Sequence, residues 1–309
     1  MLVPISMVIA TYNRLNSLID TLGSLKYVTC APSEIIIIDQ SSNWEQNKKA
    51  VLQLFEKENY NIIYETYSPP SSTASRNYGI ELAQNEIIAF SDDDVTYSKD
   101  LFTTIYNKFS CNKYGLIGAL DKNAVPNGNF FPYLFAMRSF AKRNIGHVTK
   151  SVFGRYPDFN KIKCETPTNW AMGYFFVVRK DILTNYNIRF DEKLSEYAYA
   201  EDLDFSYRYC KQSQISGMKC ILDPQIFVSH NCSKEWRTSS KKQTFSFILN
   251  RYYILKKIFP YDSEIQFWLS NLGFLLKKIL KNDNVNDYII ALILCLKNRK
   301  KISQGIFPI

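Results

Sequence analysis

The fold of this chain is indicated by the stretch EIIAFSDDD at residues 86–94, an apolar run that ends in three adjacent aspartates. A second run, EIIIID at residues 34–39, is continuous and β-branched, as in a strand buried on both faces. Two shorter strand patterns lie at 5–10 and 61–64, and helical patterns lie between the strands at 15–25, at 45–58 and from 73 onward. This β-α-β-α-β-α-β order predicts an α/β fold with a mostly parallel sheet flanked by helices.

Polar residues follow three of these predicted strands. The first strand is followed by Thr11–Arg14, the second ends at Asp39, and the fourth runs into Asp92–Asp94. Ligands of open α/β sheets bind outside the carboxyl ends of the strands, where such tips meet. We therefore expect one binding site at this edge.

The acidic cluster has the chemistry of a cation site. Three adjacent carboxylates repel one another unless a cation or hydrogen-bond donors compensate them. In an extended segment Asp92 and Asp94 project to the same side, which suits a divalent ion. Oxygen ligands favour Mg²⁺ or Mn²⁺, and these ions commonly bridge to substrate phosphates. An exposed acidic turn is the alternative, but the position after a buried strand favours the metal site.

Several motifs, in this order, resemble glycosyltransferase family 2, whose members have the GT-A fold. The matching segments are VIATYNR at 8–14, Asp39, ASRNYG at 74–79, FSDDD at 90–94, WAMG at 170–173, FDE at 190–192 and EDLD at 201–204. The resemblance runs to about residue 235. It implies a GT-A domain over 1–235, with a nucleotide-sugar-binding half at 1–115 and an acceptor-binding half at 116–235. It also implies transfer of a sugar from a nucleotide-diphosphate donor to a hydroxyl of a glycan or lipid-linked glycan.

The resemblance also implies roles for the residues at the donor side. The nucleotide pocket would be lined by Thr11, Tyr12, Asn13 and Arg14. Asp39 would accept a hydrogen bond from the base, and Arg76 would lie near the diphosphate. Asp92 would face the ribose, and Asp94 would bind the metal. Asp93 has no assigned role. The family often has Gly after the strand-end Asp, whereas this chain has QSS at 40–42, which leaves the base preference open. For Asp39 the alternative is a helix or turn cap.

The EDLD segment at 201–204 carries the candidate catalytic group. Carboxylates are common in a first helical turn because they complement the helix dipole. The resemblance instead makes Asp202 the general base that deprotonates the acceptor hydroxyl, which would invert the anomeric centre, and Glu201 an acceptor-orienting residue. Trp170 and Gly173 resemble the acceptor-side loop of the family, and a core role is the alternative for Trp170.

The chain has two histidines, and only His230 has a supporting context. It ends the apolar run IFVSH at 226–230, which places it at a strand end like the other polar tips. We assign it with Asp94 to the metal site, and a purely structural role is the alternative. His147 lies in a loop, within a region at 121–165 that has little pattern.

Positive charge is concentrated at the C-terminal end. Of the net charge of +9, residues 1–240 supply 26 basic and 25 acidic side chains, and 241–309 supply 12 and 4. A basic stripe on the sheet portion is therefore absent, which argues against nucleic-acid binding. The segment 236–309 has three amphipathic helical patterns, at 243–259, 264–281 and 285–298. These helices would contact an anionic membrane surface, the catalytic body or a second copy, and the broad apolar stripes favour the membrane.

Cysteine usage and hydropathy indicate a compartment. Seven cysteines without CxxC spacing are typical of reduced thiols, and no run reaches the roughly 18–20 apolar residues that span a bilayer. We therefore expect a cytoplasmic protein with peripheral contact at the inner face of the membrane.

Two other functions fit parts of the sequence. FSDDDVT at 90–96 matches a haloacid dehalogenase-like phosphatase with Asp92 as nucleophile, but that motif normally opens its domain, and here about ninety residues of βα units precede it. A non-catalytic glycosyltransferase-like scaffold would lack carboxylates that this chain retains at Asp92, Asp94 and Asp202.

Overall fold

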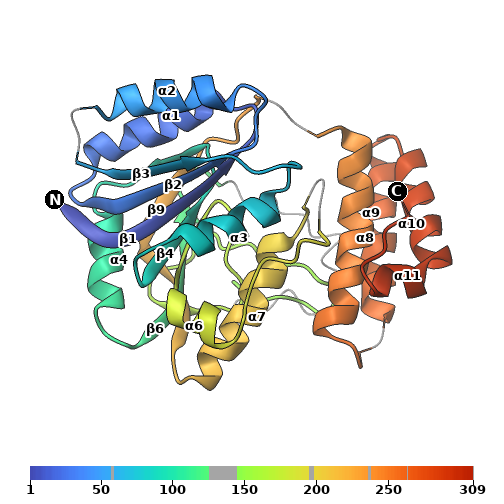
Figure 1. Cartoon of the computed structure of the whole chain (residues 1–309). Helices are drawn as coiled ribbons and strands as arrows, with labels where there is room; N and C mark the ends of the chain where they lie inside the picture. Colours follow the sequence, from blue (N-terminus) through green and yellow to red (C-terminus); the bar gives the residue numbers. More distant parts are fainter. Residues whose placement is uncertain (57–58, 125–144, 195–197, 236–237, 263, 309) are drawn as a thin grey trace.

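The computed structural model describes residues 1–56, 59–124, 145–194, 198–235, 238–262 and 264–308. A twisted sheet with helices on both faces forms the main body, and a group of C-terminal helices lies beside it (Figure 1). This arrangement confirms the α/β fold class.

The first half of the sheet is parallel, as the sequence predicts. Its strands are β1 (Leu2–Thr11), β2 (Ala31–Asp39), β3 (Asn61–Glu65) and β4 (Ile87–Ser91). They lie in the order β3-β2-β1-β4. The helices between them are α1 (Leu15–Gly23), α2 (Trp44–Leu54) and α3 (Ser72–Leu82). Because parallel strands need crossover connections, each helix carries the chain back to the starting edge of the sheet.

Beyond β4 the sheet becomes mixed. It continues through β8 (Phe175–Arg179), β6 (Tyr114–Asp121), β9 (Lys219–His230) and β5 (Val95–Tyr97), and β7 (Thr166–Pro167) pairs with β9. Strand β8 runs antiparallel to both β4 and β6, whereas β6 and β9 are parallel. Strand β9 is longer than its predicted apolar end, and β5 directly follows the acidic cluster, where no strand was predicted.

The continuous β-branched runs are explained by burial on both faces. In β2, Ile35 and Ile37 point to the face covered by α1 and α4 (Leu101–Phe109), and Ile36 and Ile38 point to the opposite face. All four are fully buried. The second face is covered by α3, α6 (Lys180–Asn185) and α7 (Glu201–Ile215). A strand between two apolar layers leaves no polar face, so alternation disappears from the sequence.

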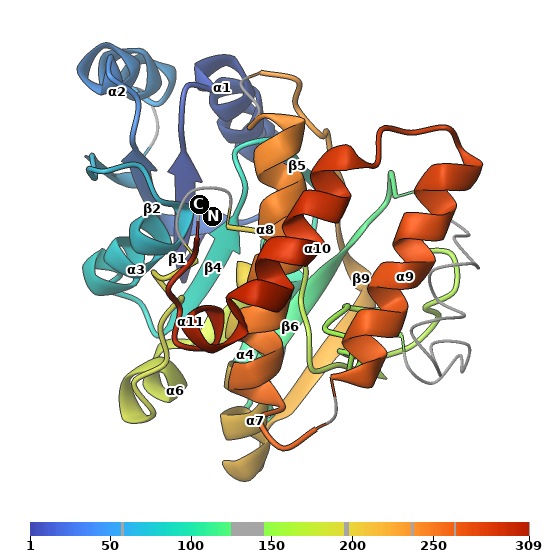
Figure 2. The same cartoon turned by 90° about the vertical axis from the view of Figure 1, so that its right-hand side faces the viewer.

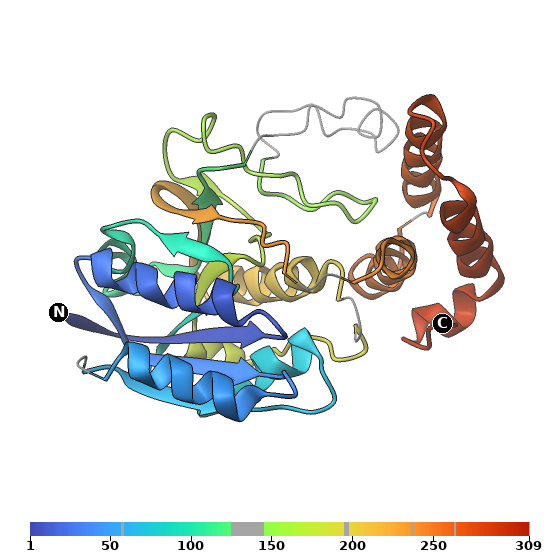
Figure 3. The same ribbon diagram turned by 90° about the horizontal axis from the view of Figure 1, so that it is seen from above.

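The C-terminal segment packs on the main body through α8 (Ser240–Ile258), one of the three contacts considered for it. Helices α9 (Ile265–Leu280), α10 (Asn286–Lys297) and α11 (Arg299–Ser303) lie on the far side of α8 (Figure 3). Arg251 of α8 is fully buried, with its guanidinium 3.6 Å from the ring centroid of Phe153. It donates to the carbonyl of Val152 at 3.2 Å and to Ser270 Oγ of α9 at 2.9 Å. Among the described helices, none has both the length and the hydropathy to cross a bilayer.

Candidate active site

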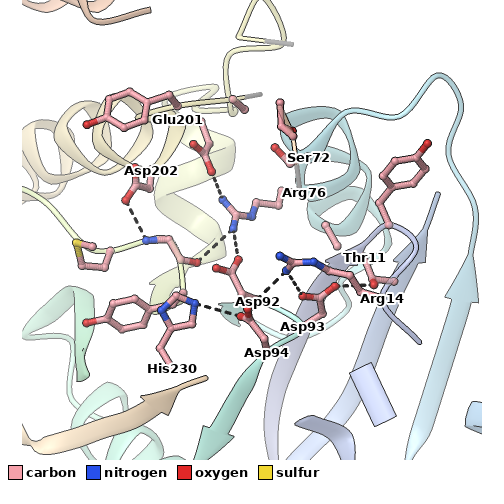
Figure 4. A pocket seen from close by; sticks show the side chains of 18 of the residues that line it. Thr11, Arg14, Ser72, Arg76, Asp92, Asp93, Asp94, Glu201, Asp202 and His230 are labelled. Atoms are coloured by element: carbon pink, nitrogen blue, oxygen red, sulfur yellow. Dashed lines mark hydrogen bonds and ion pairs between the residues drawn. The ribbon is translucent and has the colours of Figure 1, made fainter. Parts of the chain in front are cut away.

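A cavity of about 550 Å³ opens at the carboxyl ends of β1 and β4, facing the first turn of α7 (Figure 4). Its volume is within the range of about 300 to 1,000 Å³ that is usual for small-molecule sites. Ten residues predicted from the sequence line it, namely Thr11, Tyr12, Arg14, Arg76, Asp92, Asp94, Gly173, Glu201, Asp202 and His230. Side chains separated by more than two hundred residues in sequence thus share one cavity.

Asp93 holds the tip of β1 in place. Its carboxylate accepts hydrogen bonds from Thr11 Oγ1 at 2.7 Å and from the Arg14 guanidinium at 2.9 Å. Burial raises the pKa of Asp93 to about 6, although the charge of Arg14 and the bond from Thr11 oppose this rise. The sequence assigned no role to this residue. Its contacts show that it joins the acidic cluster to the predicted nucleotide-binding tip.

Asp92, Asp94 and His230 form a cluster that fits a divalent cation. One potential ligand atom from each lies within 4.8 Å of the others. His230 Nε2 is 3.1 Å from Asp94 Oδ1, and that buried oxygen receives no hydrogen bond of good geometry from the described residues. The second oxygen of Asp94 accepts from the backbone N–H of Ser233 at 2.8 Å. Two carboxylates and an imidazole that converge in this way are a suitable ligand set for Mn²⁺ or Mg²⁺.

Strand pairing brings the histidine to the aspartates. Strand β5 begins at Val95, directly after Asp94, and its first residue pairs with His230 at the end of β9. The imidazole also stacks on Tyr174, with ring centroids 5.3 Å apart. The antiparallel β5–β9 pair therefore fixes the position of His230, and the stack on Tyr174 fixes the plane of its ring.

Arg76 links the acidic cluster to the start of α7. Its guanidinium is almost completely buried and donates to Asp92 Oδ1 at 2.8 Å, to Glu201 Oε1 at 3.1 Å and to the carbonyl of Gly173 at 3.2 Å. It also lies 5.3 Å from the ring centroid of Phe190. The residue borders the cavity, as predicted, but two carboxylates already hold its charge. In this structure it therefore orients Asp92 and Glu201 relative to each other.

Asp202 is held by three donors at the start of α7. Its Oδ2 accepts from the backbone N–H of Gly173 at 3.0 Å and from Trp170 Nε1 at 3.4 Å, and its Oδ1 accepts from the N–H of Leu203 at 2.8 Å. Trp170 is 7% exposed and belongs to the core. Trp170 does not line the cavity, so its side chain reaches the site through the hydrogen bond to Asp202.

The two carboxylates that open α7 have raised pKa values. Burial, followed by the charge of Asp202, raises the pKa of Glu201 to about 8. Burial also raises the pKa of Asp202, although the hydrogen bond from Leu203 and the charge of Arg76 oppose it. A carboxylate with raised proton affinity that borders a cavity is suited to accept a proton from a bound hydroxyl.

The structure does not bring Asp39 or Asn13 into the cavity. The carboxylate of Asp39 is fully buried and accepts from Ser41 N at 2.9 Å, Asn47 Nδ2 at 2.8 Å and Tyr64 OH at 2.7 Å. These contacts support the turn-cap interpretation, and a bond from Asp39 to a base stays a prediction. Asn13 is exposed, has a φ of 56° and donates its N–H to Ser41.

Some cavity residues were not predicted from the sequence. They include Gln40, Ser72, Met172, Tyr199, Cys232, Thr238 and Gln243. Gln243 belongs to α8 and Thr238 precedes it, so the C-terminal segment completes the cavity wall although the predicted domain boundary at 235 excludes it. No motif in the sequence marks these two residues.

Comparisons with known proteins identify the family of the chain. The family model described as Glycosyl transferase family 2 matches residues 6–184, and the chain belongs to this family. Family membership leaves the phosphatase alternative for Asp92 without support. No curated protein sequence matches the chain.

Three solved structures show the same fold at low sequence identity. A mannosyltransferase, PcManGT from Pyrobaculum calidifontis in complex with GDP-Man and Mn²⁺, has a TM-score of 0.59 and 12% identity, covering 98% of this chain and 84% of its own. S. aureus TarS 1-349 in complex with UDP-GlcNAc has a TM-score of 0.59 and 14% identity, and the match covers 98% of this chain and 82% of that one. GalNAc-T7 with UDP, GalNAc and Mn²⁺ has a TM-score of 0.59 and 17% identity, and the match covers 82% of this chain and 47% of that one.

Proposed function

We propose that this protein transfers a sugar from a nucleotide-diphosphate donor to a hydroxyl of a glycan or lipid-linked glycan, with inversion and with assistance from Mn²⁺ or Mg²⁺. One observation carries this proposal. The metal-ligand cluster and the candidate base Asp202 border the same cavity, and Arg76 joins Asp92 on one side to Glu201 on the other. A donor and an acceptor can therefore meet between them.

The donor side would be formed by the tips of β1 and β4. Thr11, Tyr12 and Arg14 would contact the nucleotide, and Asp92 would face the ribose. Asp94 and His230 would hold the metal ion, which when bound offsets negative charge on the departing diphosphate. The hydrogen bonds of Asp93 to Thr11 and Arg14 keep this side of the cavity in place before the donor arrives.

Asp202 would accept the proton of the acceptor hydroxyl as its oxygen attacks the anomeric carbon. A carboxylate that forms the covalent intermediate of a retaining reaction would have to be free to attack that carbon. Glu201 and Asp92 are instead both bound to Arg76. One base and a single displacement give inversion, and the ordered contacts of Asp202 with Gly173 and Leu203 would keep its carboxylate oriented.

A thermal-shift panel tests the donor assignment. The melting temperature would be measured with UDP-, GDP- and dTDP-sugars, and with a CMP-sugar as a control that lacks a diphosphate, each with and without Mn²⁺. We expect stabilisation by one nucleotide class, with the metal required, because donor and ion share the cavity. The anomeric configuration of the product, followed by NMR, then tests inversion. Stabilisation by none of the donors, or a product that retains the donor configuration, would contradict the proposal.

We place the reaction in the cytoplasm, at a membrane surface. All seven cysteines lie within the described residues, and no disulfide links any of them, which supports a reducing compartment. A lipid-linked acceptor would be presented at the membrane. Localisation of the tagged full chain by cell fractionation tests this placement, and recovery from an oxidising compartment would contradict it.

A further inference from the structure

The outer side of α10 carries an apolar stripe. Four large aliphatic side chains on this side are between 39% and 53% exposed, namely Ile289, Ile290, Ile293 and Leu296. Their spacing places them on one side of the helix. On the opposite side, Tyr288, Ala291 and Cys295 are buried in the cluster that contains α8. Figure 2 looks onto this outer surface. A helix that is apolar on both sides is normally covered on both sides, so the outer side is expected to have a partner.

Helix α9 continues the apolar surface. On the inner side of α9, Phe267, Ser270 and Asn271 are buried, and Ser270 and Asn271 accept hydrogen bonds from Arg251 of α8. The opposite side exposes large aliphatic residues, namely Ile265, Leu272, Ile279 and Leu280, at 62%, 44%, 50% and 74%. Single exposed hydrophobic residues are ordinary, but two neighbouring helices that each expose such residues are typical of an interaction site.

The charge of the segment that carries this surface, and its exposed lysines, indicate the kind of partner. Residues 265–309 contain seven basic and two acidic side chains, a net of +5, whereas residues 1–240 have a net of +1. Lys297, Lys300 and Lys301 are exposed beside the C-terminal end of the α10 stripe. Lys281 is exposed at the end of α9. The partner must therefore accept aliphatic side chains and neutralise positive charge together.

We propose that the outer face of α9 and α10 binds the anionic surface of a lipid bilayer. The Ile and Leu side chains enter the boundary between headgroups and acyl chains, and the flexible lysines reach lipid phosphates. A second copy is a poorer partner, because an isologous contact would bring the exposed lysines Lys297, Lys300 and Lys301 of both copies into one interface. The membrane contact is independent of the proposed transfer reaction.

The contact also places the cavity near the bilayer. Helix α8 contributes Gln243 to the cavity wall, and α10 packs on the same helix. Membrane-bound surface and cavity are thus joined by one rigid element, an arrangement suited to an acceptor that is itself anchored in lipid.

Vesicle cosedimentation of the full chain tests the proposal. The fraction bound would be compared for vesicles of phosphatidylcholine alone and vesicles that also contain phosphatidylglycerol, at low and high salt. We expect binding to the anionic vesicles and weakening by salt. The double variant Ile290→Glu/Ile293→Glu should bind at least about tenfold more weakly, since burial of one such side chain shifts a partition equilibrium by about that factor.

Matched variants separate this surface from general effects. Ile215 is 67% exposed at the end of α7, so Ile215→Glu is the control for the single variant Ile290→Glu; it should bind like the unchanged chain, whereas Ile290→Glu should bind more weakly. Lys300→Glu/Lys301→Glu should weaken binding more than Lys26→Glu/Lys49→Glu, although the net charge changes equally. Thermal melting confirms that each variant is folded.

Three results would overturn the proposal. The first is no preference for anionic vesicles, and the second is unchanged binding by the Ile290→Glu/Ile293→Glu variant. The third is a dimer in sedimentation velocity that this variant dissociates, since the face would then bind a second copy.

Discussion

Replacing Asp202 by Asn removes the candidate base with the smallest change of shape. The carboxylate accepts from Gly173 and Trp170 on one oxygen and from Leu203 on the other. An amide has one oxygen, so its NH₂ group must face a donor on one of these two sides. The substitution therefore removes both the proton acceptor and one hydrogen bond, and it leaves a buried donor opposite another donor.

These two losses have different magnitudes and different readouts. A buried donor without an acceptor lowers the free energy of unfolding by about 1–3 kcal/mol. Loss of a positioned general base lowers kcat by about 10²- to 10⁴-fold. Donor affinity should change little, because the predicted nucleotide contacts lie at the tips of β1 and β4. We therefore expect a moderate stability loss together with a large loss of kcat.

The assay is steady-state transfer at saturating donor, with thermal melting and donor titration in parallel. Asp204→Asn is the matched control, because Asp204 lies in the same helical turn but is held by Arg208 and Lys257 rather than facing the cavity. This control should lose stability and keep kcat close to that of the unchanged protein. A kcat for Asp202→Asn within about tenfold of the unchanged value would refute the assignment of the base.

Three further predictions concern the same molecule. Because Asp202 must be ionised to accept a proton and burial raises its pKa, kcat should rise with pH above the ordinary carboxylate range; a pH profile of steady-state transfer measures this rise, and a flat profile across that range would contradict it. Asp94→Ala should abolish the dependence of activity and of donor-induced stabilisation on Mn²⁺, and persistence of that dependence in a metal titration would place the ion elsewhere. Arg251→Met leaves carbonyl and hydroxyl acceptors of the buried cluster without their donor, so chemical denaturation should show a loss of about 2–3 kcal/mol.

The strands and their polar tips could be predicted because they depend on local pattern. The run at 34–39 has no polar face, which is the pattern of a strand between two layers of helices, and the structure confirms it. Parallel crossovers bring the ends of β1 and β4 to one edge, so the sequence alone places Thr11, Arg14 and Asp92 together. The parallel direction of the first four strands followed from the alternation of strands and helices, whereas the mixed half of the sheet did not.

The sequence assigns His230 to the metal site with Asp94 because both follow strand patterns, but the contacts that complete the acidic cluster could not be predicted in this way. The position of His230 against Asp94 depends on the pairing of β5 with β9, and β5 is three residues long. So short a segment carries too little periodicity to indicate a strand, and its partner lies more than a hundred residues away. The anchoring role of Asp93 depends on the same packing, since its two donors come from β1 and the turn after it.

The sequence by itself determined the α/β fold, the edge of the sheet that carries the site and most of the chemistry gathered there. Tertiary structure decided that Asp39 is turned inward, that Arg76 bridges Asp92 and Glu201, and that α8 closes the cavity with Gln243. The physical reason is range. Periodicity and strand ends follow from neighbouring residues, whereas the direction of a buried polar side chain depends on which distant donors and acceptors packing brings within hydrogen-bonding distance.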